Sequence, residues 1–376
     1  MRILFMPAPA IGHAFPLVPL AWAFRNAGHD VVFVTGADAV SVAQAGLPVY
    51  DALPGFGSAE LEAQFATAVP EIFAPIQASS TEEHLAAMNE RKPLILAAWD
   101  PVVDQHVALA ERLAPDLVVY DPIFGVGPIV AALCGVPAVA HGIGIFRYTP
   151  DMLRELPAAV ALQRHGVTVP DGITTIDVAP PSLAEGPASP VAMRYTPYSG
   201  GGVLPDWLLT PPERPRIAVT VGSLVPRTQG FAYVERIAAA AKKVDAEFVV
   251  TLGDSWEEQP HWLPPNIRTT GWVPLSALLR TCAAVIHHGG DGTVLTSCAM
   301  GVPQLVLPNG PDRLVNAEVL RARGAAHVVR DDELDHTVID QLLADGDLHG
   351  VASELREEIA SLPGPAAIAS DLLGQR

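Results

Sequence analysis

The sequence predicts an α/β protein with two doubly wound halves, each a parallel sheet covered by helices on both faces. In both halves, short apolar runs of strand length alternate with amphipathic stretches of helix length. Continuous apolar strands flanked by helices are typical of parallel sheets that are buried on both faces. The chain has 376 residues, and at about 150 residues per domain this length favours two domains over one.

Each element of the first half is predicted from its own residues. An apolar run opens the chain, and a helical stretch that stops at Gly28 leads to a second apolar run. Further on, two more apolar runs flank a short helix that stops at Gly135. The expected strands are residues 2–6, 30–35, 116–121 and 137–141, and the expected helices are residues 17–27 and 129–134. Residues 53–99 are expected to be helical with long loops.

The second half repeats this alternation. Its expected strands are residues 217–221, 248–252, 285–287 and 304–307, and its expected helices are residues 231–244, 275–282 and 293–300. Residues 331–362 predict two polar helices. The tail, residues 363–376, resumes helical apolar spacing, and we expect it to pack back towards the N-terminal domain.

A run rich in Gly and Pro marks the boundary between the halves. Residues 196–215 contain three consecutive glycines and five prolines without apolar periodicity, which predicts a linker that continues neither sheet nor helix. We therefore expect an N-terminal domain over 1–200, a linker over 201–215, a C-terminal domain over 216–362 and the tail helix over 363–376.

The composition excludes several classes of protein. With 23 Lys and Arg against 41 Asp and Glu, the net charge is −18, which disfavours a nucleic-acid partner. Three cysteines without metal-ligand spacing exclude a disulfide framework and a cysteine-built zinc site. Prolines and glycines interrupt the two most apolar segments, the start of the chain and residues 122–146, so neither predicts a signal peptide or a membrane span. We expect a cytoplasmic protein.

Two residues after predicted strands form a candidate base and its partner. His13 follows the first strand beside Gly12, where an imidazole with a near-neutral pKa can act as a general base. Asp121 ends another strand and can orient an imidazolium. The ordinary alternatives are a loop histidine bonded to a backbone carbonyl and an aspartate that caps the next helix. Because ligands bind beyond the carboxyl ends of strands, the combination favours a site.

The strongest local signal is a glycine-rich turn between a buried strand and a helix. Glycines let the backbone approach a ligand closely, and the first amides of a helix favour phosphate oxygens. An ordinary strand–helix turn needs fewer glycines, so we predict a phosphate site here. The turn comprises His288, Gly289, Gly290, Asp291, Gly292 and Thr293, and a similar group of small residues, Gly222 and Ser223, follows the first strand of the second half.

Other ligand motifs are absent or weak. The glycine-rich patterns of dinucleotide-binding folds and of P-loop proteins do not occur after any predicted strand. Asp345 and Asp347 match the Asp-x-Asp of some metal-dependent sugar transferases, but they lie between two polar helices. We interpret them as a solvated turn. The tryptophans Trp99 and Trp207 are expected to be core or interface residues.

Five motifs, in this order and spacing, resemble the inverting, Leloir-type glycosyltransferases of the GT-B fold, especially bacterial enzymes that glycosylate antibiotics and other natural products. The resemblance covers essentially the whole chain and is weak only over 53–115 and 142–196, where acceptors bind. It implies two Rossmann-like domains that face a central cleft. The motifs are Gly12-His13, Val221-Gly222-Ser223, Gly271-Trp272-Val273-Pro274, the run from His287 to Thr293, and Gly301-Val302-Pro303-Gln304.

The resemblance also implies roles for single residues. His13 would deprotonate the acceptor hydroxyl with Asp121 as its partner, in the domain that binds the acceptor. Trp272 would stack on the nucleotide base, and the backbone of Val273 would hydrogen-bond the edge of that base. The other donor-binding positions it implies are Gly12, Gly222, Ser223, His288, Gly289, Gly290, Asp291, Gly292 and Thr293.

One position departs from the family pattern. Where the family usually has Asp-Gln to hold the sugar hydroxyls, this chain has Asp312-Arg313. Arg adds a charge and changes the hydrogen-bonding geometry. The departure puts a common hexose in doubt and leaves a modified deoxysugar open.

The activity that the resemblance implies is inverting, metal-independent hexosyl transfer from a nucleoside diphosphate. The expected donor is a thymidine diphosphate deoxysugar, and the expected acceptor is a hydroxyl of an apolar natural-product aglycone. No cofactor and no metal are expected beyond this co-substrate, and a homodimer is left open. The alternatives are a C-glycosyltransferase, which His13 disfavours, a sugar-nucleotide epimerase, which needs further carboxylates, and a non-catalytic homologue, which needs no base.

Overall fold

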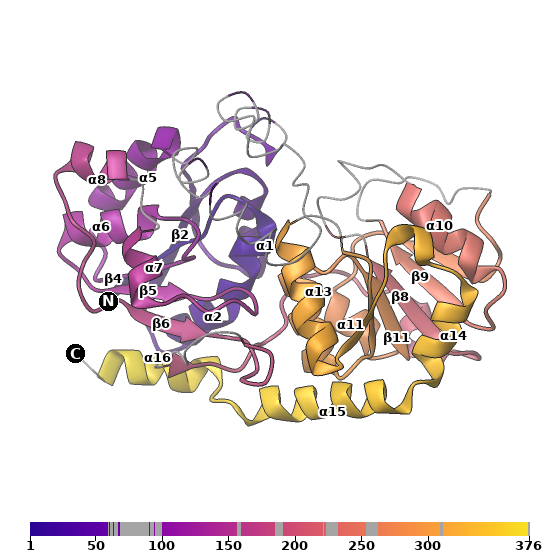
Figure 1. Ribbon diagram of the computed structural model, residues 1–376. Coiled ribbons are helices and arrows are strands. Elements are labelled where there is room, and N and C mark those ends of the chain that lie inside the picture. Colours follow the sequence, from indigo (N-terminus) through magenta and orange to yellow (C-terminus); the bar gives the residue numbers. More distant parts are fainter. Residues whose placement is uncertain are drawn as a thin grey trace. The chain divides into compact units, whose positions relative to one another are not determined.

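The structure is a computed structural model (Figure 1) that describes residues 1–58, 60, 63, 67, 90, 94, 100–155, 159–184, 191–220, 222, 232–252, 262–308 and 311–374. The chain divides into two compact units. The first contains Met1–Ala179, Ala184–Thr196 and Leu362–Arg376, and the second contains Pro180–Leu183 and Pro197–Ser361. Almost all of the region 53–99, expected to be helical, lies outside the described residues.

The first unit is built on a seven-stranded parallel sheet with the order β3-β2-β1-β4-β5-β6-β7. The strands are β1 (Arg2–Met6), β2 (Asp30–Thr35), β3 (Val49–Asp51), β4 (Leu117–Tyr120), β5 (Ala138–His141), β6 (Thr174–Asp177) and β7 (Val191–Ala192). The helical elements are α1 (Ile11–Ala14), η1 (Phe15–Leu17), α2 (Val18–Asn26), η2 (Ala37–Ala45), α5 (Asp100–Leu113), α6 (Val126–Cys134), α7 (Pro150–Glu155), α8 (Ala159–His165) and, from the end of the chain, α16 (Pro365–Gly374).

Side chains that alternate along β1 enter two different layers of core, as the pleat of a strand requires. Leu4 and Met6 pack in one buried cluster with residues of α5 and α6. On the other face, the ring of Phe5 stacks on Phe33 of β2 at 5.0 Å and meets Phe24 of α2 edge-on at 6.3 Å. The continuous apolar sequence of this strand is therefore explained by burial on both faces.

The tail helix completes the layer on the α2 side of this sheet. α16 packs against α2, and its Ile368 and Leu372 are buried (Figure 1). The backbone N–H of Arg194 donates to the carbonyl of Pro363 at 2.8 Å, which holds the start of the tail to the end of β7.

The second unit has a six-stranded parallel sheet with the order β10-β9-β8-β11-β12-β13. The strands are β8 (Arg216–Thr220), β9 (Glu247–Thr251), β10 (Ile267–Thr270), β11 (Ala284–His287), β12 (Gln304–Val306) and β13 (Ala326–Val328). The helical elements are η4 (Asp206–Leu209), α10 (Ala232–Ala241), α11 (Leu275–Leu279), α12 (Asp291–Met300), α13 (Pro311–Arg323), η6 (Asp331–Glu333), α14 (His336–Ala344) and α15 (Gly346–Ser361).

Alternation again sends the strand residues into two cores. Ile217 and Val219 of β8 pack in a buried cluster with residues of α10 and α14, whereas Ala218 packs on the opposite face with residues of α11. α12 and α15 pack against each other. Both units are thus doubly wound, and the predicted fold class is confirmed.

The segment 201–215, predicted as a linker without regular structure, is more ordered than its sequence indicates. It clusters with the second unit and contains η4. The ring of Trp207 in η4 contacts the guanidinium groups of both Arg216 and Arg268, each 5.1 Å from the ring centroid. These cation–π contacts explain why a Pro-rich segment takes a defined conformation here, and they give Trp207 a structural role.

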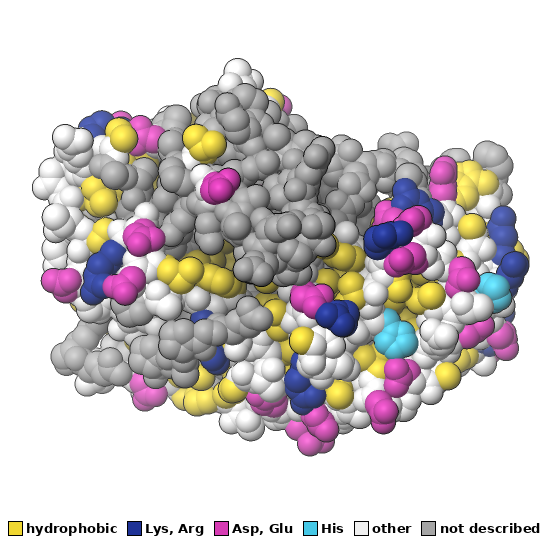
Figure 2. All heavy atoms as spheres, in the orientation of Figure 1, with side chains coloured by type: hydrophobic (Ala, Val, Ile, Leu, Met, Phe, Trp, Pro, Cys, Tyr) yellow, Lys and Arg dark blue, Asp and Glu magenta, His cyan; other side chains and the backbone are white. Residues whose placement is uncertain are grey.

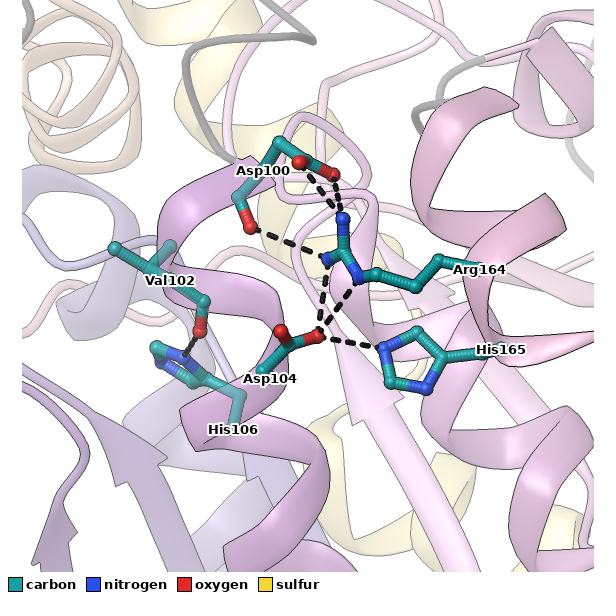
Figure 3. Close-up of polar contacts among 6 residues, drawn as sticks. All are labelled: Asp100, Val102, Asp104, His106, Arg164 and His165. Carbon is teal, nitrogen blue, oxygen red and sulfur yellow. Dashed lines mark hydrogen bonds and ion pairs between the residues drawn. The ribbon is translucent and has the colours of Figure 1, made fainter.

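Ion pairs join α5 to α8 in the first unit (Figure 3). Arg164 bridges Asp100 and Asp104, at 2.8 and 2.9 Å, and His165 also contacts Asp104 at 2.8 Å. Partial burial opposes ionisation of Asp104, but the hydrogen bonds from His165 and Arg164 outweigh it and hold the pKa of this carboxyl below its usual value. His106 of α5 is instead buried, donates to the carbonyl of Val102 at 2.7 Å, and has its pKa lowered to about 4 by burial.

The described surface carries no concentration of basic residues on the face drawn in Figure 2, where Lys and Arg side chains are scattered among Asp and Glu. All three cysteines are free thiols. No helix in the described part of the chain combines the length and the apolar character needed to cross a membrane.

Packing between α6 and β4 leads to a first prediction. A Cβ at Gly127 of α6 would collide with the Tyr120 side chain, so Gly127→Ala should lower the free energy of unfolding by about 1–3 kcal/mol. A Cβ at Gly350, in the exposed part of α15, would meet nothing within 4 Å, so Gly350→Ala should raise it by up to about 1 kcal/mol. Denaturant unfolding of both variants measures the difference, and equal stability would contradict the packing argument.

Candidate active site

Both sheets have a point at which the chain changes its direction of winding. β1 pairs in parallel with β2 on one side and β4 on the other, and β8 pairs with β9 and β11 in the same way. Ligands of open α/β sheets bind beyond the carboxyl ends of such strand pairs. His13 follows β1 and Asp121 follows β4, while Gly222 follows β8 and His288 follows β11. These four predicted site residues therefore lie at the two switch points.

The pair at the first switch point is in direct contact. Nδ1 of His13 lies 2.5 Å from Oδ2 of Asp121, whose side chain is fully buried, whereas the His13 side chain is 28% exposed. Oδ1 of Asp121 accepts a hydrogen bond from the backbone N–H of Ile123 at 3.0 Å. Asp121 thus serves as partner of the histidine and as acceptor in a local turn, but it does not cap a helix, because α6 begins at Val126 with Gly125 as its N-cap.

The short helix α1 that carries His13 is fixed at its start. The backbone N–H of Ile11 donates to Oδ1 of Asp38 at 2.8 Å, which joins the beginning of α1 to η2. A Cβ at Gly12 would meet nothing within 4 Å, so the backbone beside the histidine borders open space. An imidazole oriented by a buried carboxylate next to open space is the arrangement that a general base requires.

At the second switch point, the His288 ring is enclosed by glycine backbone. A Cβ at Gly222 would lie 2.5 Å from Cε1 of His288, and one at Gly290 would lie 2.6 Å from its Nε2. Burial, with smaller contributions from Arg313 and His287, lowers the pKa of His288 to about 3, against a backbone hydrogen bond with Thr220 that raises it. Nδ1 of this ring is buried without a hydrogen-bond partner. His288 is therefore a neutral imidazole with an unused polar atom.

The glycine-rich turn leads directly into α12, which begins at Asp291, two residues earlier than the sequence indicates. Gly290 is the N-cap and provides no side chain, so the first amides of the helix depend on other partners. Gly292 and Thr293 lie in the first turn, and a Cβ at Gly292 would meet nothing within 4 Å. Open space at a helix N-terminus suits an anion.

Trp272 and Val273 follow β10, at the same edge of the sheet. The indole N–H of Trp272 donates to the carbonyl of Ser199 at 2.8 Å, and 41% of the residue remains exposed. Val273 is buried against the α11 side of the core. The hydrogen bond leaves Trp272 with an exposed aromatic surface and a fixed position.

A known protein family matches both halves of the chain. Residues 22–222 match the N-terminal domain, and residues 235–374 the C-terminal domain, of the family described as erythromycin biosynthesis protein CIII-like. The elloramycin glycosyltransferase ElmGT of Streptomyces olivaceus is 36% identical over 377 residues, which cover 99% of this chain and 97% of that protein.

Solved structures extend the likeness to the fold. The glycosyltransferase SnogD from Streptomyces nogalater has a TM-score of 0.82 at 36% identity, covering 100% of this chain and 99% of its own. The glycosyltransferase SsfS6 of Streptomyces sp. SF2575, complexed with thymidine diphosphate, has a TM-score of 0.80 at 30% identity, with both chains covered completely. The chain belongs to this family of glycosyltransferases. It is a GT-B enzyme of natural-product biosynthesis, as the sequence motifs indicate.

The side chains at two positions that the family resemblance assigns to donor binding are not described. Ser223 lies outside the described residues, and only the backbone of Asp312, at the start of α13, is described. Arg313 of α13 is partly buried beside Gly289, with its backbone oxygen 3.1 Å from where a Cβ of Gly289 would lie. This places the residue that departs from the family pattern next to the glycine-rich turn.

The sequence did not single out a third set of residues at the edge of the first sheet. His141 ends β5 beside Asp121, donates to the carbonyl of Gly142 at 2.7 Å, and has its pKa lowered to about 4 by burial. Arg147 forms a largely buried ion pair with Asp177 at the end of β6. The signal for His141 was its place at the end of a predicted strand, whereas the Arg147–Asp177 pairing depends on tertiary structure.

Across the described residues, no group of three or more His, Cys, Asp or Glu side chains is placed to hold a metal ion. Asp345 caps the end of α14, accepts from the backbone N–H of Leu348 at 3.0 Å and contacts His327 at 2.8 Å. The Asp-x-Asp motif is therefore not the solvated turn that the sequence predicts, because Asp345 alone separates α14 from α15 and Asp347 lies in the first turn of α15.

The enclosure of His288 predicts which glycines tolerate a side chain. Gly222 has a φ of +67° and no room for a Cβ beside the His288 ring, so Gly222→Ala should cost about 1–3 kcal/mol of stability. Gly292→Ala, at a position without close neighbours and without positive φ, should leave the unfolding midpoint nearly unchanged. Thermal unfolding of the two variants decides, and a larger loss for Gly292→Ala would contradict the enclosure.

Proposed function

We propose that this glycosyltransferase is an inverting O-glycosyltransferase that moves a deoxysugar from thymidine diphosphate to a hydroxyl group of an apolar aglycone. The observation that supports it most strongly is the contact between His13 and the buried Asp121 at the carboxyl edge of the first sheet. A base of this kind is what attack by a hydroxyl requires.

His13 takes the proton of the acceptor hydroxyl as its oxygen attacks the anomeric carbon. With Nδ1–H donated to Asp121, the ring receives this proton at Nε2, and the carboxylate stabilises the imidazolium that forms. The new bond to oxygen forms as the bond to the departing diphosphate breaks. A single displacement of this kind inverts the anomeric configuration.

Negative charge grows on the diphosphate as it leaves, and the second switch point offers groups of opposite polarity. The first amides of α12 and the hydroxyl of Thr293 favour anionic oxygens, and the neutral His288 ring adds a donor when its proton is on Nδ1, the nitrogen that has no partner in the protein. Such preorganised donors stabilise the leaving group directly. We therefore propose that the reaction needs neither a metal nor a cofactor.

The choice of nucleotide and sugar rests on two further features. The exposed indole of Trp272 provides a stacking surface for the base, beside the backbone of Val273. The relative SsfS6 is described as complexed with thymidine diphosphate. In this proposal Arg313, whose backbone lies next to the glycine-rich turn, contacts the sugar or a phosphate, and its fork of donors differs from the amide of the usual Gln.

C-glycosylation remains the alternative within the family. It would form a bond to an aromatic carbon, whereas a base held by a buried carboxylate is directly useful for a hydroxyl acceptor. The pairing of His13 with Asp121 therefore favours O-glycosylation.

Removal of the base should separate chemistry from donor binding. The assay contains EDTA, which should leave the activity of the unchanged enzyme intact. Under these conditions His13→Ala should lower kcat by roughly 10²- to 10⁴-fold. Its affinity for thymidine diphosphate should stay within about threefold, since His13 belongs to the other unit's switch point. The assay follows transfer of labelled sugar to a panel of aromatic and polyketide acceptors. Turnover by His13→Ala equal to that of the unchanged enzyme would overturn the assignment of the base.

Removal of the imidazole at the second switch point should have the opposite signature. His288→Ala should weaken binding of thymidine diphosphate by about tenfold or more, as expected for the loss of a hydrogen bond to a charged group. Isothermal titration of the nucleotide measures this, with His13→Ala as the matched control that retains binding. Unchanged affinity in His288→Ala would remove the phosphate interpretation.

A further inference from the structure

We propose that His287, the residue before the enclosed His288, is a positioning residue that holds the glycine-rich turn in its anion-binding conformation by accepting a hydrogen bond from the backbone of Gly289. The proposal rests on the proposed function, because it concerns the same diphosphate site. His287 belongs to one of the five family motifs, but the sequence analysis assigned it no role.

The hydrogen bonds around His287 fix which of its nitrogens carries the proton. The backbone N–H of Gly289 points to Nδ1 at 3.1 Å, and a backbone amide can only donate, so Nδ1 presents a lone pair. Nε2 therefore carries the hydrogen and donates to Oε1 of Gln304 at 2.9 Å. The amide group of Gln304 then donates to Sγ of Cys298 at 3.4 Å. Every member of this buried chain has one consistent direction.

The same glycine is held from its other side. The side-chain amide of Asn316 donates to the carbonyl of Gly289 at 2.9 Å and to Oδ1 of Asp291 at 3.0 Å. Gly289 has a φ of +91°, a conformation that glycine enters and leaves freely, so the two hydrogen bonds fix a residue that is otherwise free to change conformation. His287 of β11 and Asn316 of α13 thus hydrogen-bond to the backbone N–H and C=O of Gly289, which lies between His288 and the start of α12.

The hydrogen bond from Gly289 requires that the His287 ring is uncharged. His287 is completely buried, and burial lowers its pKa to about 4, with a smaller opposing effect of Gln304. The ionisable neighbours that act on this part of the turn are His288 and Arg313. A proton on Nδ1 would place two donors against each other and release Gly289.

Two substitutions separate the acceptor from the rest of the ring. The amide oxygen of Asn is as many bonds from Cβ as Nδ1 is, so His287→Asn can still accept from Gly289. The amide of Gln reaches as far as Nε2, so His287→Gln can contact Gln304 but leaves Gly289 without its acceptor. Both variants replace an imidazole by a neutral amide, which makes them matched.

The first measurement uses thymidine diphosphate and the sugar donor. We expect His287→Asn to keep the dissociation constant of thymidine diphosphate within about threefold and His287→Gln to raise it about tenfold. In His287→Gln the effect should appear in KM for the donor more than in kcat. The turn of this variant is disordered in the free enzyme, and donor binding restores its conformation. Equal effects of the two variants, or a larger effect of His287→Asn, would overturn the proposal.

The second measurement needs no ligand. Hydrogen exchange of a peptide that covers residues 286–294 should be faster in His287→Gln than in His287→Asn or the unchanged protein, because the amide of Gly289 has lost its acceptor. Identical exchange in all three would overturn the proposal. If the nucleotide does not bind the unchanged protein, the proposed function fails, while the exchange still tests the role of His287.

A third variant covers a failure of His287→Gln to fold. Gln304→Met removes the acceptor of Nε2–H, so the ring is no longer held in the form that accepts from Gly289. We expect intermediate exchange at Gly289 and an intermediate loss of nucleotide affinity of about threefold to tenfold. Exchange and affinity equal to those of the unchanged protein would count against the proposal.

Discussion

The parallel pairing of β1 with β4, and of β8 with β11, is the constraint on which the site depends. Met6 lies opposite Tyr120 in the first pairing, and Thr220 lies opposite His287 in the second, so the segments that follow start side by side. Residues more than a hundred positions apart, His13 and Asp121, are thereby brought within one hydrogen bond. The local sequence places each residue after a strand, but only the pairing of those strands brings the two side chains into contact. The register of the sheet determines their contact, and the two buried cores maintain that register.

The histidines of the site differ in burial, and burial decides which of them can be protonated near neutral pH. His13 keeps part of its side chain exposed and has a carboxylate at Nδ1, which suits a residue that gains and loses a proton. His287 and His288 are buried without a carboxylate partner, and the cost of desolvating a cation lowers the pKa of both well below neutral. They act through fixed lone pairs and N–H groups instead. The environment, rather than the residue type, decides which histidine can be the base.

The sequence predicted the inner strands and missed the outer ones. β1 and β2 begin and end where their apolar runs do, and β4, β5, β8, β9, β11 and β12 differ from the prediction by one residue at one or both ends. The edge strands β3, β7, β10 and β13, together with β6, were not predicted. β7 has only two residues, and the other four are short and mix polar with apolar residues. Trp272 was nevertheless found from its motif, although its strand was not. The hydrogen bonds that fix Gly289 could not be predicted from the sequence, because Asn316 reaches Gly289, and Gln304 reaches His287, only through tertiary packing.

The glycines of the site belong to two groups with different physical reasons. Gly222 and Gly290 leave no room for a Cβ, because the His288 ring fills that space in the protein itself. Gly12 and Gly292 have nothing within 4 Å, so the folded chain gives no steric reason for a glycine at either position. Both border the residues that the proposed mechanism brings to the reacting groups, and a ligand approaching the backbone supplies the missing reason. The space around each glycine thus separates Gly222 and Gly290, which pack against His288, from Gly12 and Gly292, which leave the site open.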